Sequence, residues 1–214
     1  MIPIKDSRVP RRYPVMRNFI ILANIAVFLY LLWQGESVIM AFIDKYAFLG
    51  SKLAENPVGN SYTFITYQFI HGGVGHILGN MWYLFVFAPH VESKLGMGRF
   101  LFFYLFSGMI SCMVQAVAVP AHSIPLVGAS GSVAGVLGFY AAMFPGAKIL
   151  TWVPIGLFGW FVKIPAIAFL LFWFFFQFLL AYLSQTSGVV AGGVAWWAHL
   201  GGFVFGLLFG LSIR

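Results

Sequence analysis

Six long apolar stretches run through this sequence of 214 residues and constrain its fold more than any other feature. They cover approximately residues 18–34, 76–91, 100–119, 130–144, 164–183 and 196–213. Charged residues make up only 8% of the chain, whereas about a quarter is typical of soluble domains. Backbone polar groups inside lipid have no water to bond, so closed helices are the economical solution. The sequence therefore predicts an all-α, multi-pass integral membrane protein with six transmembrane helices.

The length of the chain leaves room for one helical bundle, because each crossing of a hydrocarbon core about 30 Å thick needs roughly 20 residues. We expect a short basic N-terminus over residues 1–17 and a single six-helix domain over residues 18–214. No small-residue cleavage site follows the first apolar run, from Phe19 to Trp33. That run is therefore predicted to be a retained helix and not a removed signal peptide.

The basic residues set the orientation of the six helices. A cytoplasmic N-terminus places every Lys and Arg on the inner side except Lys45 and Lys52, as the positive-inside rule requires. The net charge of +7 is thus a topology signal and does not indicate a nucleic-acid partner. The long outer segment from Gly35 to Gly75 mixes apolar and charged residues. We expect it to form a re-entrant loop lying partly in the membrane interface, and an ordinary packed loop is the alternative.

Four polar residues within the apolar stretches are candidates for chemistry, because polar groups at membrane depth usually face the bundle interior or a wet cavity. They are His76, Asn80, Ser130 and His199. All four lie in the first turns of the second, fourth and sixth helices, which run from outside to inside. The sequence therefore predicts that they meet at the outer face. For His76 and Asn80, the alternative is interhelical hydrogen bonding.

Helix length and glycine spacing refine this placement. The fourth helix has about 15 residues, or roughly 22 Å, which is short of the hydrocarbon thickness, so Ser130 should lie below the outer surface. Small residues four apart allow two helices to approach closely, and they occur in both the fourth and sixth helices: Gly131 and Gly135, then Gly202, Gly206 and Gly210. This pattern would bring Ser130 within reach of His199.

The chemistry predicted for this pair is nucleophilic catalysis. A serine hydroxyl is a weak nucleophile until a base takes its proton, and neutral His199 can do so. The sequence puts no Asp or Glu near the sixth helix, so a Ser-His dyad is simpler than a triad. The Ser130 N–H, His76 and Asn80 could donate hydrogen bonds to the tetrahedral intermediate. With a single cysteine and no HExxH helix, we expect no metal and no cofactor.

Three motifs resemble those of the rhomboid family of intramembrane serine proteases. The second helix carries His71, His76 and Asn80 in the family's spacing, the fourth begins Gly128-Ala-Ser130-Gly131, and the sixth has His199 followed by Gly202 and Gly206. The resemblance spans nearly the whole chain. It implies a prokaryotic-type six-helix core in a plasma membrane and cleavage of single-pass transmembrane proteins near the outer face. It also implies a Ser130–His199 dyad, an oxyanion hole that includes His76 and Asn80, and a supporting role for His71.

The resemblance also makes the aromatic fifth helix around Phe172 to Phe176 a candidate lateral gate, together with the outer loop that follows it. A lipid-facing helix is the alternative. Three positions depart from the family pattern. Ala134 stands where some members have a Tyr that packs on the catalytic His, and Tyr62-Thr63 replaces a frequent Trp-Arg pair. The bracing of His199 and the packing of the outer loop are therefore open.

Other functions fit less well. A channel or transporter would not explain a Gly-flanked serine that opens a short helix. The main alternative is a non-catalytic rhomboid-like protein that binds transmembrane partners, although such proteins usually lack the Ser or the His. We interpret His90 and His122 as solvated or interfacial residues and Cys112 as a helix-packing residue.

Overall fold

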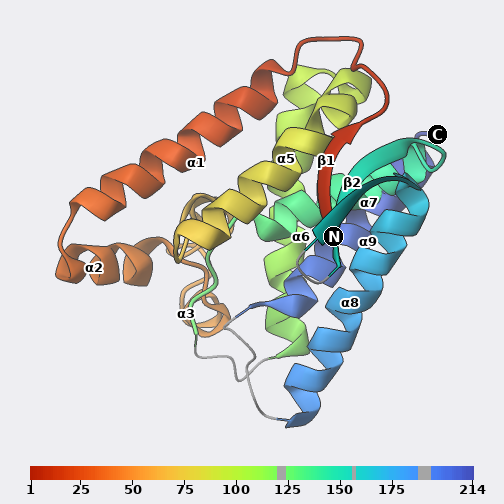
Figure 1. The fold of residues 1–214 in the computed structure, drawn as a ribbon. Helices are drawn as coiled ribbons and strands as arrows, with labels where there is room; N and C mark the ends of the chain where they lie inside the picture. Colours follow the sequence, from red (N-terminus) through yellow and green to blue (C-terminus); the bar gives the residue numbers. More distant parts are fainter. Residues whose placement is uncertain (120–123, 156–157, 188–193) are drawn as a thin grey trace.

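The computed structural model describes residues 1–119, 124–155, 158–187 and 194–214. The chain is mostly helical, as predicted, and each of the six apolar stretches coincides with a helix apart from small shifts at the ends (Figure 1). These helices are α1 (Val15–Trp33), α5 (Val74–Leu95), α6 (Met97–Ala118), α7 (Ser130–Met143), α8 (Ala166–Ser187) and α9 (Trp196–Ser212). Within the described residues, α1, α6 and α8 are long and apolar enough to cross a membrane, and α7 and α9 are shorter apolar helices.

A three-stranded antiparallel sheet departs from the predicted all-α class. Its strands are β1 (Ile2–Asp6), β2 (Lys148–Ile155) and β3 (Phe158–Pro165), in the order β1-β2-β3. The N-terminal strand contacts α5, and the β2–β3 hairpin contacts α8, so the sheet lies between those two helices (Figure 1). The hairpin is rich in β-branched and aromatic residues, which favour strands. Local sequence patterns do not predict this sheet, because α1, α5, α6 and α7 separate β1 from its partner β2 along the chain.

Helix α7 forms the centre of the bundle. Every residue from Gly131 to Ala142 is buried, and α6 and α9 pack directly against it. Glycines allow this close packing. A Cβ on Gly206 would overlap the backbone of Gly135, and one on Gly202 would overlap the Gly131 carbonyl. The small faces of α7 and α9 therefore interlock backbone to backbone.

The outer segment between α1 and α5 contains the short helices α2 (Glu36–Tyr46), α3 (Gly50–Glu55) and α4 (Thr63–Thr66), and a 3-10 turn, η1 (Tyr67–Phe69). Two polar residues of η1 are buried and tie it to the bundle. Tyr67 donates to the Gly108 carbonyl at 2.7 Å, and the Gln68 amide accepts from Ser132 Oγ at 2.8 Å. Tyr62 and Thr63 occupy the place of the family's frequent Trp-Arg pair. The Tyr62 hydroxyl donates to the Lys45 carbonyl, and the Thr63 hydroxyl donates to the Asn60 carbonyl.

Buried acids hold the opposite end of the bundle together. Both oxygens of Glu92 on α5 accept backbone N–H groups at the start of α1, from Met16 and Arg17. Asp6 of β1 accepts from His90 Nε2 at 2.9 Å, and also from Tyr140 and Arg8. Burial raises the pKa of the Asp6 carboxyl, but these hydrogen bonds outweigh it and hold the pKa well below its ordinary value.

The interpretation of His90 as a solvated residue is therefore wrong, because its side chain is buried against Asp6. The sequence could not reveal this pairing, since the two residues are far apart along the chain. His122 lies outside the described residues. Cys112 is buried in a cluster with Phe48, Tyr67 and Leu126, as the packing interpretation predicts.

Candidate active site

Ser130 begins α7 at the end of a constrained segment. Leu126 forms an antiparallel bridge with Phe48, and the Gly128 N–H donates to the Tyr67 carbonyl at 2.9 Å. Gly128 has φ +117°, and a Cβ there would lie 2.6 Å from the His76 ring. Only glycine suits both the left-handed backbone and this contact. The turn thus delivers Ser130 to the N-terminus of α7, beside His76.

His199 lies in the first turn of α9, and its ring is held from several sides. Its Nδ1 is 2.7 Å from Oε1 of Gln177, which comes from α8. The Trp173 ring lies 6.1 Å from the imidazole, centroid to centroid, and the Trp196 ring lies 5.8 Å away. An amide oxygen can only accept a hydrogen bond, so Nδ1 carries the proton. Nε2 is then left with a free lone pair.

His76 and Asn80 project from one face of α5. The His76 ring packs edge-on against His71, with 5.1 Å between centroids, and His71 Nε2 accepts the Ala129 N–H at 3.5 Å. Asn80 is only 8% exposed, and its Nδ2 has no hydrogen-bond partner among the residues that the structure describes. A buried amide donor without a partner costs stability. It therefore marks Asn80 as a donor available to a ligand.

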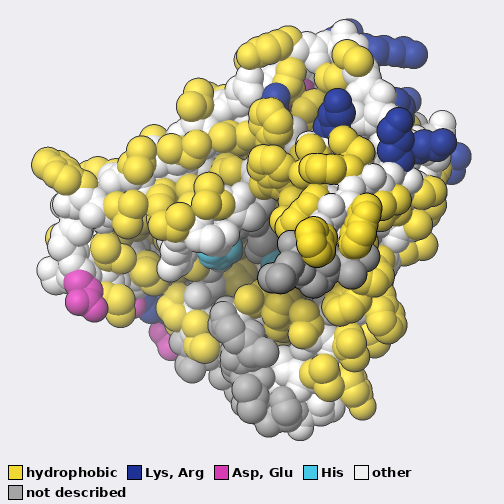
Figure 2. Space-filling view, in the orientation of Figure 1, with side chains coloured by type: hydrophobic (Ala, Val, Ile, Leu, Met, Phe, Trp, Pro, Cys, Tyr) yellow, Lys and Arg dark blue, Asp and Glu magenta, His cyan; other side chains and the backbone are white. Residues whose placement is uncertain are grey.

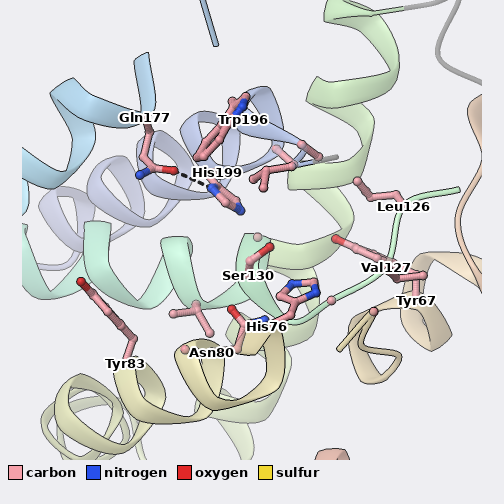
Figure 3. A pocket seen from close by; sticks show the side chains of 18 of the residues that line it. Tyr67, His76, Asn80, Tyr83, Leu126, Val127, Ser130, Gln177, Trp196 and His199 are labelled. Carbon is pink, nitrogen blue, oxygen red and sulfur yellow. Dashed lines mark hydrogen bonds between the residues drawn. The ribbon is translucent and has the colours of Figure 1, made fainter. Parts of the chain in front are cut away.

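A cavity of about 570 Å³ joins these side chains. Figure 3 shows the Ser130 hydroxyl and the His199 ring pointing toward one another across it, with His76 and Asn80 on the wall formed by α5. No hydrogen bond joins Ser130 to His199 here, and catalytic hydrogen bonds often tighten only when substrate binds. The structure thus brings together the four candidate residues, which are spread over more than a hundred positions of the sequence.

Comparison with known proteins identifies the family. The model of the Rhomboid domain matches residues 58–214, which include every candidate residue named above. The chain belongs to the rhomboid family. Its mostly helical structure and its three motifs agree with that membership, as the resemblance implied.

Several curated rhomboids are similar to this rhomboid chain. The putative rhomboid protease YdcA of Bacillus subtilis is 33% identical over 62% of this chain and 64% of its own length. Rhomboid protein 1, mitochondrial, of Saccharomyces cerevisiae is 30% identical over 89% of this chain and 51% of its own. The presenilin-associated rhomboid-like protein A, mitochondrial, of Danio rerio is 31% identical over 75% and 40%. The chain therefore spans about two fifths to two thirds of the length of these relatives.

Gln177 is the residue of this rhomboid site that sequence reasoning missed. It lies within an aromatic run of α8, between Phe176 and Phe178, and is buried. A lone amide at membrane depth is itself a signal. Gln177 lies in the middle of its helix, whereas His76, Asn80, Ser130 and His199 lie in first turns, so helix position alone does not associate it with them.

The bracing of His199, left open by Ala134, is also explained. Ala134 is fully buried and offers no ring to the imidazole. The indoles of Trp173 and Trp196 lie beside it instead.

The candidate gate helix, α8, has both exposed and packed aromatic residues. Phe172, Phe175 and Phe176 are exposed, whereas Trp173 and Phe174 pack on Phe203 of α9. This pattern suits a lipid-facing helix as well as a gate. Most of the outer loop after α8, residues 188–193, lies outside the described residues.

Proposed function

We propose that this rhomboid is an intramembrane serine endopeptidase in which Ser130 is the nucleophile and His199 the base. One observation carries the proposal. A serine, a histidine whose Nδ1 contacts Gln177, and an Asn80 amide without a partner among the described residues line the same cavity. Nucleophile, base and oxyanion donor are the parts that acyl transfer needs.

The proposed topology is six crossings with the N-terminus on the cytoplasmic side of a prokaryotic plasma membrane. Most Lys and Arg side chains gather at one end of the molecule, and the exposed acids Glu36, Asp44 and Glu55 belong to the outer segment at the other (Figure 2). This separation supports the orientation that the positive-inside rule predicts. The cavity then opens near the outer face, and the buried segment around Tyr67 and Gln68 is the part of the outer loop that re-enters the bundle.

The reaction follows from the positions of these atoms. His199 Nε2 takes the proton of Ser130 as Oγ attacks the carbonyl carbon of the scissile bond. The carbonyl oxygen becomes an oxyanion, which the Ser130 N–H, His76 and Asn80 stabilise by hydrogen bonding. The C–N bond then breaks, and the imidazolium gives its proton to the departing amine. Water, activated by the same imidazole, hydrolyses the acyl-enzyme and restores both side chains.

The electrostatic role of Gln177 is to fix the tautomer of His199. A neutral amide that accepts from Nδ1–H keeps the proton off Nε2 and holds the ring in place, as a carboxylate does in a triad. It cannot compensate the imidazolium charge as a carboxylate would. The dyad therefore relies on orientation and on the enclosing rings.

The substrates proposed are single-pass transmembrane proteins cut near the outer membrane face. A helical substrate hides its carbonyls in backbone hydrogen bonds, so the cleaved segment must unwind before Ser130 can attack. Gly or Pro near the cleavage site should favour this step. The alternative function is a non-catalytic protein that binds transmembrane helices. It would not explain why the buried Asn80 amide faces the cavity without a partner among the described residues.

The test is cleavage of a model transmembrane substrate by purified protein in detergent, with labelling by a serine-directed fluorophosphonate. Wild type should cleave and become labelled, and Ser130→Ala should do neither. Ser51→Ala, an exposed serine of α3, is the control and should behave as wild type. Equal cleavage by Ser130→Ala would exclude the proposal, and a folded wild type without cleavage or labelling would favour the binding protein.

A further inference from the structure

One face of the sheet combines lysines and apolar side chains in an ordered pattern. Residues directly opposite each other on neighbouring strands point to the same face. The register sets Lys5 opposite Leu150 and Leu150 opposite Lys163. Lys148, two residues before Leu150, lies on the same face. All three lysines are exposed, so this end of the face is positively charged.

The next row of the same face is apolar. Ile2 lies opposite Trp152, and Trp152 lies opposite Phe161. Ile2 is 42% exposed and Phe161 is 66% exposed. The other face contains Asp6, Ile149 and Thr151, of which Asp6 binds His90 and Tyr140 of the bundle. The face with the lysines is therefore the one turned away from the bundle, and we call it the outward face.

The spacing of the two rows matches the boundary of a bilayer. Rows two residues apart are separated by about 7 Å along the strand. The polar region on each side of the hydrocarbon core is about 5–8 Å thick. This value is half the difference between the total thickness of the bilayer and the thickness of its core. Lysines level with phosphate groups would thus place Trp152 and Phe161 at the edge of the acyl chains, where indole rings prefer to lie.

We propose that the outward face is embedded in the inner leaflet, with Lys5, Lys148 and Lys163 binding the phosphate groups of anionic phospholipids. The row formed by Ile2, Trp152 and Phe161 then contacts acyl chains. The N-terminal strand is part of this surface and not a free cytoplasmic tail. This inference requires the proposed orientation in the membrane but does not depend on proteolysis.

The backbone of β1 fits such a place. An unpaired strand edge is unfavourable where water is scarce. Pro3 has no N–H, and its carbonyl accepts the Trp82 indole N–H of α5 at 2.6 Å. The polar groups of Pro3 therefore need no water.

The depth of the sheet can be measured with spin labels. The native cysteine, buried Cys112, is replaced by Ala, and single cysteines are introduced as Phe161→Cys or Lys163→Cys. References are Leu29→Cys on the exposed side of α1 and Val58→Cys, which is 87% exposed in the outer segment. In phosphatidylglycerol–phosphatidylcholine vesicles, accessibility to oxygen reports lipid, and accessibility to a neutral nickel chelate reports water.

We expect the oxygen-to-nickel ratio of the Phe161 label to approach that of Leu29 and to exceed that of Val58 several-fold. The Lys163 label should fall between the two references. A Phe161 label as accessible to nickel as Val58 would overturn the proposal. So would a Phe161 label that a transmembrane substrate shields from both reagents, because the face would then bind protein and not lipid.

The three lysines are tested separately by replacing Lys5, Lys148 and Lys163 with Gln. The readout is the preference of the protein for spin-labelled phosphatidylglycerol over spin-labelled phosphatidylcholine. Each lysine near an anionic surface contributes about a fivefold preference, so the triple variant should lose most of the wild-type selectivity. Replacement of the outer Lys45 and Lys52 is the control and should retain it. Unchanged selectivity in the triple variant would exclude the role of the lysines.

Discussion

His199 and Gln177 are joined by a hydrogen bond of 2.7 Å between Nδ1 and Oε1. The bond crosses from α9 to α8 and defines which nitrogen of the imidazole faces Ser130 (Figure 3). It is the contact on which the proposed dyad depends most, because the sequence supplies no carboxylate for this position.

Replacing Gln177 by Leu should lower kcat with little effect on KM, since the amide contacts His199 and not the substrate. Loss of a buried hydrogen bond of about 1–2 kcal/mol corresponds to roughly a tenfold decrease. Gln177→Glu should keep the ring oriented and, by stabilising the imidazolium, move the acidic limb of the pH–rate profile to higher pH. Gln185→Leu, on the exposed side of the same helix, is the matched control. An unshifted profile in Gln177→Glu would argue against a positioning role.

Asn80→Ala should lower kcat by about a hundredfold with KM nearly unchanged, as expected when one oxyanion donor is removed. His76→Ala should act in the same direction. Steady-state cleavage of a transmembrane substrate measures both constants. Asn18→Ala, on the surface of α1, should have no effect. A larger effect on KM than on kcat would instead assign Asn80 to substrate binding.

Gly206→Ala should destabilise the protein, because the added Cβ overlaps the Gly135 backbone and neither helix can yield without separating. Overpacking of this kind costs about 1–3 kcal/mol. Gly98→Ala in α6 is the control, since a Cβ there meets nothing within 4 Å. Thermal unfolding in detergent should show a lower midpoint for Gly206→Ala and an unchanged or slightly higher one for Gly98→Ala. Equal midpoints would contradict the interlocked packing of α7 and α9.

Asp6→Asn should weaken the docking of β1 and remove part of the pH dependence of stability. The pKa of Asp6 is lower in the folded protein than its ordinary value, so its contribution is complete above about pH 4. It is lost as the pH falls through the depressed folded pKa. Wild type should therefore lose thermal stability below about pH 4 more steeply than Asp6→Asn. Asp44→Asn, whose side chain is 75% exposed, should follow the wild-type curve.

Much of the site could be predicted from the sequence, because most of its residues belong to short sequence patterns that can be recognised locally. Ser130 follows a glycine turn and opens a helix, and His76 and Asn80 are four residues apart on one helix. The predicted alternation of crossings then places their helix ends on the same side. Hydrophobicity and helical period act within a few turns, so they can be recognised without knowing the fold.

The residues that could not be predicted depend on long-range pairing. Gln177 had an intrinsic signal as an amide among phenylalanines, but only the approach of α8 to α9 shows that it meets His199. Asp6 and His90 carried no such signal. The sheet needed β1 from the first residues of the chain and β2 from beyond α7, and no local pattern indicates that these strands pair.

The sequence by itself determined that the chain is a helical membrane protein, where its six apolar helices lie, and which residues could do chemistry. Those properties follow from transfer of apolar segments out of water and from backbone hydrogen bonding within each segment. The tertiary structure alone decided how His199 is oriented, which groups bind the Asp6 carboxylate and that the N-terminal strand completes a sheet. Each of these depends on contacts between elements far apart in the chain, whose geometry is set by packing and not by local preference.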